Sequence, residues 1–504
     1  MGQYLSRMPL LVLLVGICAL AMLVPAAVAM IEEDFRTGRR FFYSALLFFI
    51  LTVVLGFATQ GLKPVTSARS HLAGLALAYL LLPAILAVPL ADAIGNTRYF
   101  NAYFEMLSCL TTTGATLFDP ARLGDGEHLW RALVGWLGGL LVWVTAMAVM
   151  APLNLGGFEV SSESQGRQVV SSGAQMQAAA PAVRLRRAVL FLAPTYAGLT
   201  SLLWLLQVLA GESDLTALAH AMAVMSTSGI SPEGSLNAQP GGFLSELVIF
   251  FFFIFALTRH SFADRVTPET PRMLFHDREL RLAAYVVIAL TGLFFLRHWI
   301  GALEIEPGVE GRSALTALWG SLFTITSFVT TTGFVSDYWA EARGWSGRPT
   351  PGLLLVGLAL MGGGAATTAG GIKLIRVYAL YKHGARELGK LSHPHSVAAG
   401  GRMGRRIRRE GAYIAWVFFM LFILSTAAIM LALSMTGLDF EDSFVLAAAA
   451  LSTTGPLAAF GGEHPIVYAA LSDPAKMVLM GAMILGRLET LALIALFNPG
   501  FWRI

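Results

Sequence analysis

The sequence predicts an all-α polytopic membrane protein with about ten transmembrane helices, arranged as two N-terminal helices followed by four pseudo-symmetric helix/pore-loop/helix repeats. Three observations predict this fold: an apolar composition, apolar runs of membrane-spanning length, and a short Ser/Thr and Gly motif that occurs four times. Of the 504 residues, 56% are hydrophobic and 13% are charged, with a mean hydropathy of +0.66. This composition is too apolar for a soluble domain.

The composition also excludes several function classes. The two cysteines, Cys18 and Cys109, both lie in apolar runs, which argues against a disulfide framework or a thiolate metal site. The net charge of +4 is modest and the basic residues gather in a few loops, so membrane topology explains them better than nucleic-acid binding does. No nucleophile, base and orienting residue stand at a recognisable spacing, and we expect no enzyme activity.

Apolar runs long enough to span a membrane occur along the whole chain. Residues 8–31 carry no charge, and this length favours a span over a cleaved signal peptide, although AAVAM resembles a cleavage site. The expected spans are residues 9–30, 41–61, 72–94, 129–151, 187–210, 242–258, 281–302, 352–381, 411–436 and 475–498.

Shorter helical stretches lie between some of these spans, near residues 98–111, 214–226, 313–330 and 439–452. Each is followed at once by a polar motif that contains glycine. Non-helical backbone at membrane depth is tolerated only inside protein or beside water, so these stretches are predicted to be re-entrant pore helices. Asp214 and Asp439 are the expected caps of the second and fourth.

Charge in the loops predicts the orientation. Lys and Arg concentrate in residues 61–71, 152–187, 259–281 and 382–410, which places these loops and both termini in the cytoplasm. The most basic segment, GRMGRRIRREG at residues 401–411, is interpreted as a topology determinant, a contact with anionic membrane lipid, or a docking surface for a partner.

Four glycine motifs recur in register: TTTGAT (residues 111–116), STSGIS (226–231), TTTGFV (330–335) and STTGPL (452–457). A single such motif is typical of a helix C-cap, whereas four copies spaced by about 105 to 120 residues indicate an internal repeat. The expected units are an N-terminal helix pair at 1–66 and pore repeats at 67–160, 161–265, 266–400 and 401–504.

The chemistry of the four motifs suits a cation. A dehydrated alkali ion needs oxygens on several sides, and four converging segments supply rings of carbonyls. Glycine permits the required backbone angles, the C-terminal end of each pore helix favours positive charge, and the hydroxyls either add ligands or brace the segment from behind. The expected filter residues are Thr112, Thr113, Gly114, Thr227, Ser228, Gly229, Thr331, Thr332, Gly333, Thr453, Thr454 and Gly455.

Four single-glycine pore loops preceded by two extra spans resemble the Trk/Ktr/HKT superfamily of potassium transporters, and the extra pair indicates its TrkH branch. The segments GGGAATTAGGIK (residues 362–373) and GRLE (486–489) are similar to signatures of that family. The resemblance implies potassium uptake across the bacterial inner membrane and K⁺ as the transported ion, with no organic cofactor in this chain. It also implies a homodimer regulated by a cytosolic nucleotide-binding, TrkA-like subunit.

The glycine cluster within the 352–381 span should interrupt its helix, because each glycine costs about 1 kcal/mol relative to alanine. Close packing of helices through small residues is the alternative, and a phosphate-binding loop is excluded because GxxxxGK[ST] is not matched. The resemblance implies an intramembrane gating loop that obstructs the pore. Its residues are Gly362, Gly363, Gly364, Ala365, Ala366, Thr367, Thr368, Ala369, Gly370 and Gly371, with Lys373 beside them.

Two charged residues within apolar stretches stand out. Arg487 lies about twelve residues into the last span, near the middle of the membrane, where a charge must face water or a partner such as Glu489. The resemblance implies that Arg487 projects into the cavity below the filter as an electrostatic barrier. Glu105 in the first pore helix is expected either to brace the filter or to pair with a buried neighbour.

Two alternatives remain for the function. One is a sodium-permeable or weakly selective transporter of the same fold, because one glycine per motif provides fewer carbonyl rings. Gly114 favours potassium, since in plant HKT relatives a serine at this position accompanies sodium preference, but Ser228 and Ile230 depart from the family pattern. The second motif is therefore expected to fit the family worst. The other alternative, a multipass membrane enzyme, lacks the necessary acidic or histidine cluster.

Overall fold

The computed structural model describes residues 8–59, 68–150, 181–234, 240–258, 277–300, 311–346, 352–392 and 409–489, and every regular element within them is a helix. Seven helical segments in these ranges are long and apolar enough to cross a membrane, accompanied by three shorter apolar helices. The prediction of an all-α polytopic membrane protein is confirmed. The predicted unit boundaries at residues 66, 160, 265 and 400, and residues 401–408 of the basic segment, lie outside the described residues.

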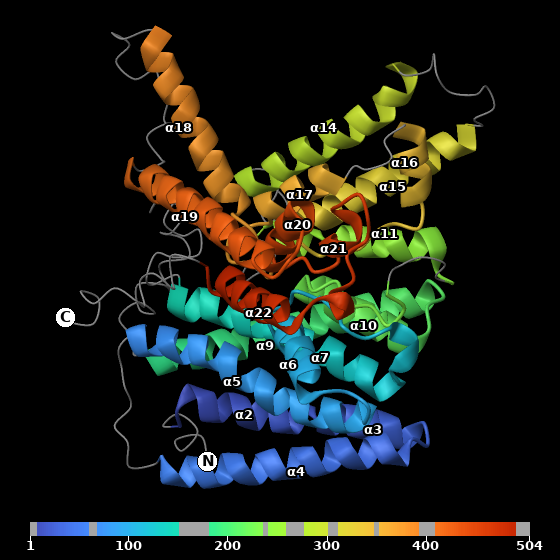
Figure 1. Ribbon diagram of the computed structural model, residues 1–504, viewed down its shortest axis with the longest axis vertical. Coiled ribbons are helices and arrows are strands. Elements are labelled where there is room, and N and C mark those ends of the chain that lie inside the picture. Colours follow the sequence, from blue (N-terminus) through green and yellow to red (C-terminus); the bar gives the residue numbers. More distant parts are fainter. Residues whose placement is uncertain are drawn as a thin grey trace.

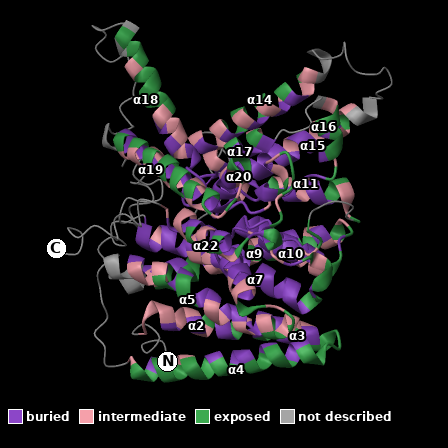
Figure 2. Cartoon of the chain, viewed as in Figure 1, coloured by how far each residue is buried: buried purple, intermediate pink, exposed green. Residues whose placement is uncertain are grey.

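The N-terminal helices lie along one edge of the molecule (Figure 1). Helices α2 (Leu10–Ala21) and α3 (Leu23–Ile31) form the first span, and α4 (Phe35–Ala58) forms the second, capped by the Asp34 carboxylate, which accepts a hydrogen bond from the Thr37 N–H at 3.2 Å. The outer face of α4 is exposed (Figure 2), and many of its exposed residues are large and apolar. Such a face suits lipid tails, which are as apolar as the side chains themselves.

The four repeats each contain a span, a pore helix and a second span. In the first two repeats these elements are α5 (Ala68–Ile94), α6 (Tyr99–Leu110), η1 (Pro120–Arg122), α7 (Asp125–Thr145) with the π-helix η2 (Ala146–Met150), then α9 (Pro181–Leu209), α10 (Asp214–Ser226), α11 (Gly242–Phe252) and α12 (Ile254–Leu257). In the last two they are α14 (Arg278–Ile300), α15 (Gly311–Val329), α16 (Trp339–Ser346), α17 (Gly352–Met361), α18 (Leu374–Ser392), α19 (Arg409–Ser434), α20 (Phe440–Leu451), α21 (Leu457–Phe460), η6 (Tyr468–Ala470) and α22 (Asp473–Leu488).

The pore helices α6, α10, α15 and α20 match the four short predicted helices to within two residues at each end. The predicted cap of α10 was wrong by one residue: the Ser213 hydroxyl accepts the bond from the Thr216 N–H, and Asp214 is the first helical residue. Asp439 occupies the N-cap position of α20 but makes no capping bond with its side chain.

The C-terminal ends of all four pore helices are buried in the centre of the molecule (Figure 2), so their dipoles direct partial negative charge inward. Glycines let the second spans approach these ends closely. A Cβ on Gly138 of α7 would collide with the Leu110 carbonyl, and one on Gly486 of α22 would collide with the Leu451 carbonyl. Leu110 and Leu451 stand four residues before the filter glycines of their repeats, so repeats 1 and 4 make the same contact.

The predicted interruption of the 352–381 span is confirmed. Helix α17 ends at Met361 and α18 begins at Leu374, with twelve non-helical residues between them. The last described helix, α22, ends at Leu488, and Glu489 adopts a left-handed φ of 60°. The remainder of the predicted 475–498 span, from residue 490, lies outside the described residues.

Candidate ion pathway

The four glycine motifs share one backbone turn. The N–H of the third motif residue returns to a pore-helix carbonyl five residues earlier, in the bonds Thr113 to Ser108 (2.8 Å), Ser228 to Ala223 (2.9 Å), Thr332 to Ser327 (3.0 Å) and Thr454 to Ala449 (2.8 Å). The second residue is left-handed in every copy, with φ of 54° at Thr112, 54° at Thr227, 59° at Thr331 and 53° at Thr453. Positive φ is exceptional for a β-branched residue, so four matching copies indicate an imposed conformation.

The hydroxyl groups of each motif divide into two sets. The first and third residues pair behind the turn, in Thr111–Thr113 (2.9 Å), Ser226–Ser228 (3.0 Å), Thr330–Thr332 (3.0 Å) and Ser452–Thr454 (3.1 Å). These side chains therefore brace the segment from behind. The sequence had left open whether the hydroxyls do this or add ligands for the ion. Among the second-position residues, the hydroxyls of Thr112 and Thr453 have no hydrogen-bond partner in the described part of the chain.

The four segments close into a ring in the order of the repeats. A Cβ added at Gly114 would collide with the carbonyl of Ser228, and one at Gly229 with the carbonyl of Thr332. At Gly333 it would lie 3.1 Å from Pro456, and at Gly455 within 2.7 Å of the Gly114 carbonyl carbon. Neighbouring segments thus leave no room for a side chain at Gly114, Gly229 and Gly455, and at Gly333 little room combines with a positive φ that favours glycine.

The fourth segment departs from the pattern of the other three. Gly114, Gly229 and Gly333 have positive φ (74°, 63° and 82°), but Gly455 lies outside the left-handed region, and its N–H donates to the Thr113 carbonyl at 2.6 Å. Within this chain the STSGIS segment keeps the common turn, because Ser228 supplies the bracing hydroxyl, and its poorer fit to the family pattern stays a prediction. The residue after Gly455 is Pro456, whose ring fixes φ and which leads directly into α21.

The intramembrane loop (residues 362–373) is closed at its base by backbone hydrogen bonds and has positive φ at several positions. The N–H of Ile372 donates to the Leu360 carbonyl and that of Leu374 to the Gly363 carbonyl, both at 2.9 Å. Positive φ occurs at Gly362 and Gly371, and also at the non-glycine residues Ala366 (56°) and Lys373 (82°). The loop lies against the filter, since the Gly370 N–H donates to the Thr331 hydroxyl at 2.8 Å.

All four repeats hold this loop. Its bonds run from the Trp143 indole N–H to the Ala366 carbonyl (2.9 Å), from the Thr368 hydroxyl to the Met225 carbonyl (3.2 Å), from the Ala365 N–H to the Glu279 carboxylate (2.9 Å) and from the Arg487 guanidinium to the Thr368 carbonyl (2.7 Å). Sequence reasoning missed Trp143 and Glu279, because neither stands in a motif.

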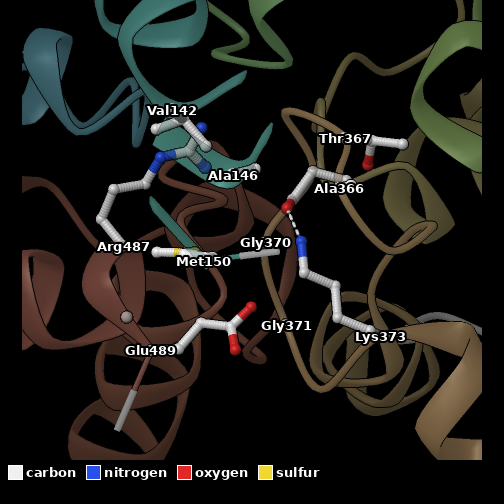
Figure 3. A pocket seen from close by; sticks show the side chains of 12 residues that line it. Val142, Ala146, Met150, Ala366, Thr367, Gly370, Gly371, Lys373, Arg487 and Glu489 are labelled. Atoms are coloured by element: carbon white, nitrogen blue, oxygen red, sulfur yellow. Dashed lines mark hydrogen bonds between the residues drawn. The ribbon is translucent and has the colours of Figure 1, made fainter. Parts of the chain in front are cut away.

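Buried charges surround a cavity beside the loop, lined also by Val142, Ala146 and Met150 of α7 and η2 (Figure 3). Lys373 donates to the Ala369 carbonyl, and the Arg487 Nε and Nη2 atoms have no hydrogen-bond partner within the described residues. The alternative pairing of Arg487 with Glu489 is not observed. Glu489 instead accepts from Arg376 at 2.7 Å, so Lys373 and Arg487 leave the cavity with excess positive charge.

Sequence comparison establishes the family. A protein from Halomonas elongata, named Trk system potassium uptake protein TrkH, is 30% identical over 80% of this chain and 79% of its own length. The chain belongs to the TrkH family. The TrkH family profile, described as a cation transport protein, matches residues 285–503.

Other TrkH family members extend the match to nearly the whole chain. The Trk system potassium uptake protein TrkH of Salmonella typhimurium is 28% identical, over 97% of this chain and 98% of its own. The crystal structure of the potassium transporter TrkH from Vibrio parahaemolyticus superposes with a TM-score of 0.83 at 26% identity, covering 99% of this chain and 100% of that one. The TrkH fold therefore includes both N-terminal helices and all four repeats.

Proposed function

We propose that this protein takes up potassium across the bacterial inner membrane through the four-segment filter, with both termini in the cytoplasm. The observation that carries the proposal is the fourfold recurrence of one strained backbone turn around a closed ring. A ring of backbone carbonyls replaces the hydration shell of a cation, and a turn held by its own pore helix gives such a ring a fixed size. The names of the relatives, potassium uptake proteins, support the choice of ion.

In the proposed pathway, an ion loses water at the carbonyls of the filter residues, helped by the inward-pointing ends of the pore helices. The free hydroxyls of Thr112 and Thr453 offer it two further oxygens. The intramembrane loop then obstructs the path and must move for the ion to pass. Lys373 and Arg487 raise an electrostatic barrier beside the loop, because a buried positive charge repels a cation.

We further propose that the protein is a transporter without enzyme activity, works as a homodimer, and is regulated by a TrkA-like cytosolic subunit that binds a nucleotide. Two relatives are named components of a Trk system, which supports an assembly of more than one part. The basic sequence at residues 401–411 suits recognition by such a subunit or by anionic lipid.

A weakly selective monovalent cation transporter is the second candidate, and the fourth segment favours it. The Gly455 N–H donates a hydrogen bond to the Thr113 carbonyl oxygen at 2.6 Å, so one filter oxygen already has a partner within the protein. Fewer free carbonyls reduce the discrimination between potassium and sodium.

Flux through purified protein in liposomes tests both candidates. Potassium, rubidium and sodium flux are measured with and without a proton gradient, beside protein-free liposomes as the control. We expect potassium and rubidium flux to exceed sodium flux without a gradient. Equal flux of all three ions would support the weakly selective alternative, and no flux of any ion would contradict the proposed function.

A further inference from the structure

A polar side chain stands nine residues before the filter glycine in three of the four repeats: Glu105, His220 and Thr324. Each reaches from its pore helix to the chain that leaves the filter. Glu105 accepts from the Leu117 N–H at 2.9 Å, His220 Nε2 lies 3.0 Å from the Ser231 hydroxyl, and the Thr324 hydroxyl accepts from the Ser336 N–H at 3.2 Å. These contacts link the two sides of each filter segment.

The fourth repeat holds its segment differently. Leu446 occupies the corresponding position and has no polar atom in its side chain, but the Tyr468 hydroxyl donates to the Gly455 carbonyl at 3.0 Å. The four filter segments are therefore held by four different chemical groups, although their turns share one hydrogen-bond pattern.

Glu105 differs from the other groups because it is charged and fully buried. Its second oxygen accepts from Arg131 Nε of α7 at 2.7 Å, and the two side chains are 0% and 3% exposed. One carboxylate thus joins α6, α7 and the chain after Gly114. Hydrogen bonds that involve an ionised group are about twice as strong as neutral ones, so the first segment has the stiffest support.

We propose that Glu105, held by Arg131, is a positioning residue that sets the ion selectivity of the filter. The inference rests on the proposed function, because it assumes that ions pass beside Gly114. The Leu117 N–H stands three residues after Gly114, so releasing it lets the first segment move outward from the ring. Selectivity depends on the spacing of the carbonyls, and a looser quarter admits the smaller or more strongly hydrated ion.

The test compares potassium and sodium flux in liposomes for Glu105→Gln, Glu105→Ala and the double variant Glu105→Gln/Arg131→Gln. Glu105→Ala should lower the potassium to sodium flux ratio by about tenfold, because it removes both charged bonds, and Glu105→Gln by less, because its amide oxygen still accepts from Leu117. The double variant leaves no unpaired buried charge, so it keeps the test open if a single variant fails to fold. It should also lower the ratio.

Glu127→Gln is the matched control. Glu127 is a buried carboxylate of the same repeat, 5% exposed, whose hydrogen bond comes from Thr37 of α4 at 3.4 Å, away from the filter. Its flux ratio should equal that of the wild type. Wild-type ratios in folded Glu105→Ala or in the double variant would overturn the proposal, whereas absence of wild-type potassium flux would contradict the proposed function instead.

Discussion

The filter and the intramembrane loop are both non-helical backbone in the centre of the protein, but they are held in opposite ways. Each filter turn is held first by its own pore helix, through backbone bonds that span at most six residues, and longer-range bonds such as that from Gly455 to Thr113 are added to these. The loop is held by partners far away in sequence, 223 residues for Trp143 and 119 for Arg487. A locally held turn forms wherever its segment folds, whereas the loop depends on how the four repeats pack.

This difference suits two different tasks. The proposed selective ring must keep its dimensions, and four copies of a local turn would provide this. The proposed gate needs two arrangements of similar free energy, and a loop held by separate hydrogen bonds, each worth about 1 kcal/mol, suits that role, although its release would break the bond from Gly370 to Thr331 of the filter.

The largest expected effect comes from breaking one filter turn. Gly333→Asp should abolish potassium uptake, because Gly333 has a φ of 82° and a Cβ there would lie 3.1 Å from Pro456. Rubidium uptake into cells that lack other potassium transporters measures it. Gly344→Asp is the control, since Gly344 on α16 has open space around it. Ordinary uptake by well-expressed Gly333→Asp protein would refute the filter assignment.

Removing the intramembrane loop should raise potassium flux, whereas breaking a filter turn should abolish potassium uptake. Deletion of residues 365–369 should raise passive flux by more than about tenfold, the change expected if a barrier of 1.4 kcal/mol is lost. Flux in liposomes at matched protein density measures it, and the thermal stability of the variant serves as the control for folding. An unchanged or smaller flux would show that the segment serves helix packing and not gating.

Arg487→Gln tests the contact between Arg487 and the loop together with the positive charge of the Arg487 side chain. The shorter neutral side chain loses the 2.7 Å bond to the Thr368 carbonyl and removes a cation from the cavity. We expect potassium flux to rise about fivefold, the equivalent of about 1 kcal/mol. Arg36→Gln, at an exposed position of α4, should leave flux unchanged. Lower flux in Arg487→Gln would contradict its role as a barrier.

Trp143→Phe should give the smallest effect, because the bond to the Ala366 carbonyl that it removes is neutral and the aromatic ring is kept. We expect flux to rise about twofold, measured as above. Trp136→Phe provides a close control: its indole donates at 2.9 Å to Thr200, outside the loop, and both tryptophans pack against Tyr196. Equal effects of the two substitutions would show that only packing around Tyr196 matters.

Much of the fold could be predicted from the sequence because its signals are local. Apolar length located seven of the ten predicted spans among the described residues. The pore helices were placed to within two residues, because a helix and the polar motif that ends it lie in one continuous segment. The glycine cluster likewise predicted the break between α17 and α18. The four motifs were recognisable as one feature because they repeat.

The sequence by itself therefore determined the helices, the repeat of four glycine motifs and the interruption of one span. Only the tertiary structure decided which buried charges meet, pairing Glu105 with Arg131 and Arg376 with Glu489, and which segment departs from the common turn. Apolar length and glycine content are properties of one continuous segment, so the sequence alone shows their effect on that segment. The partners of a buried side chain depend on how separate helices pack together, 26 residues apart for Glu105 and Arg131 and 113 for Arg376 and Glu489, and no local pattern specifies that packing.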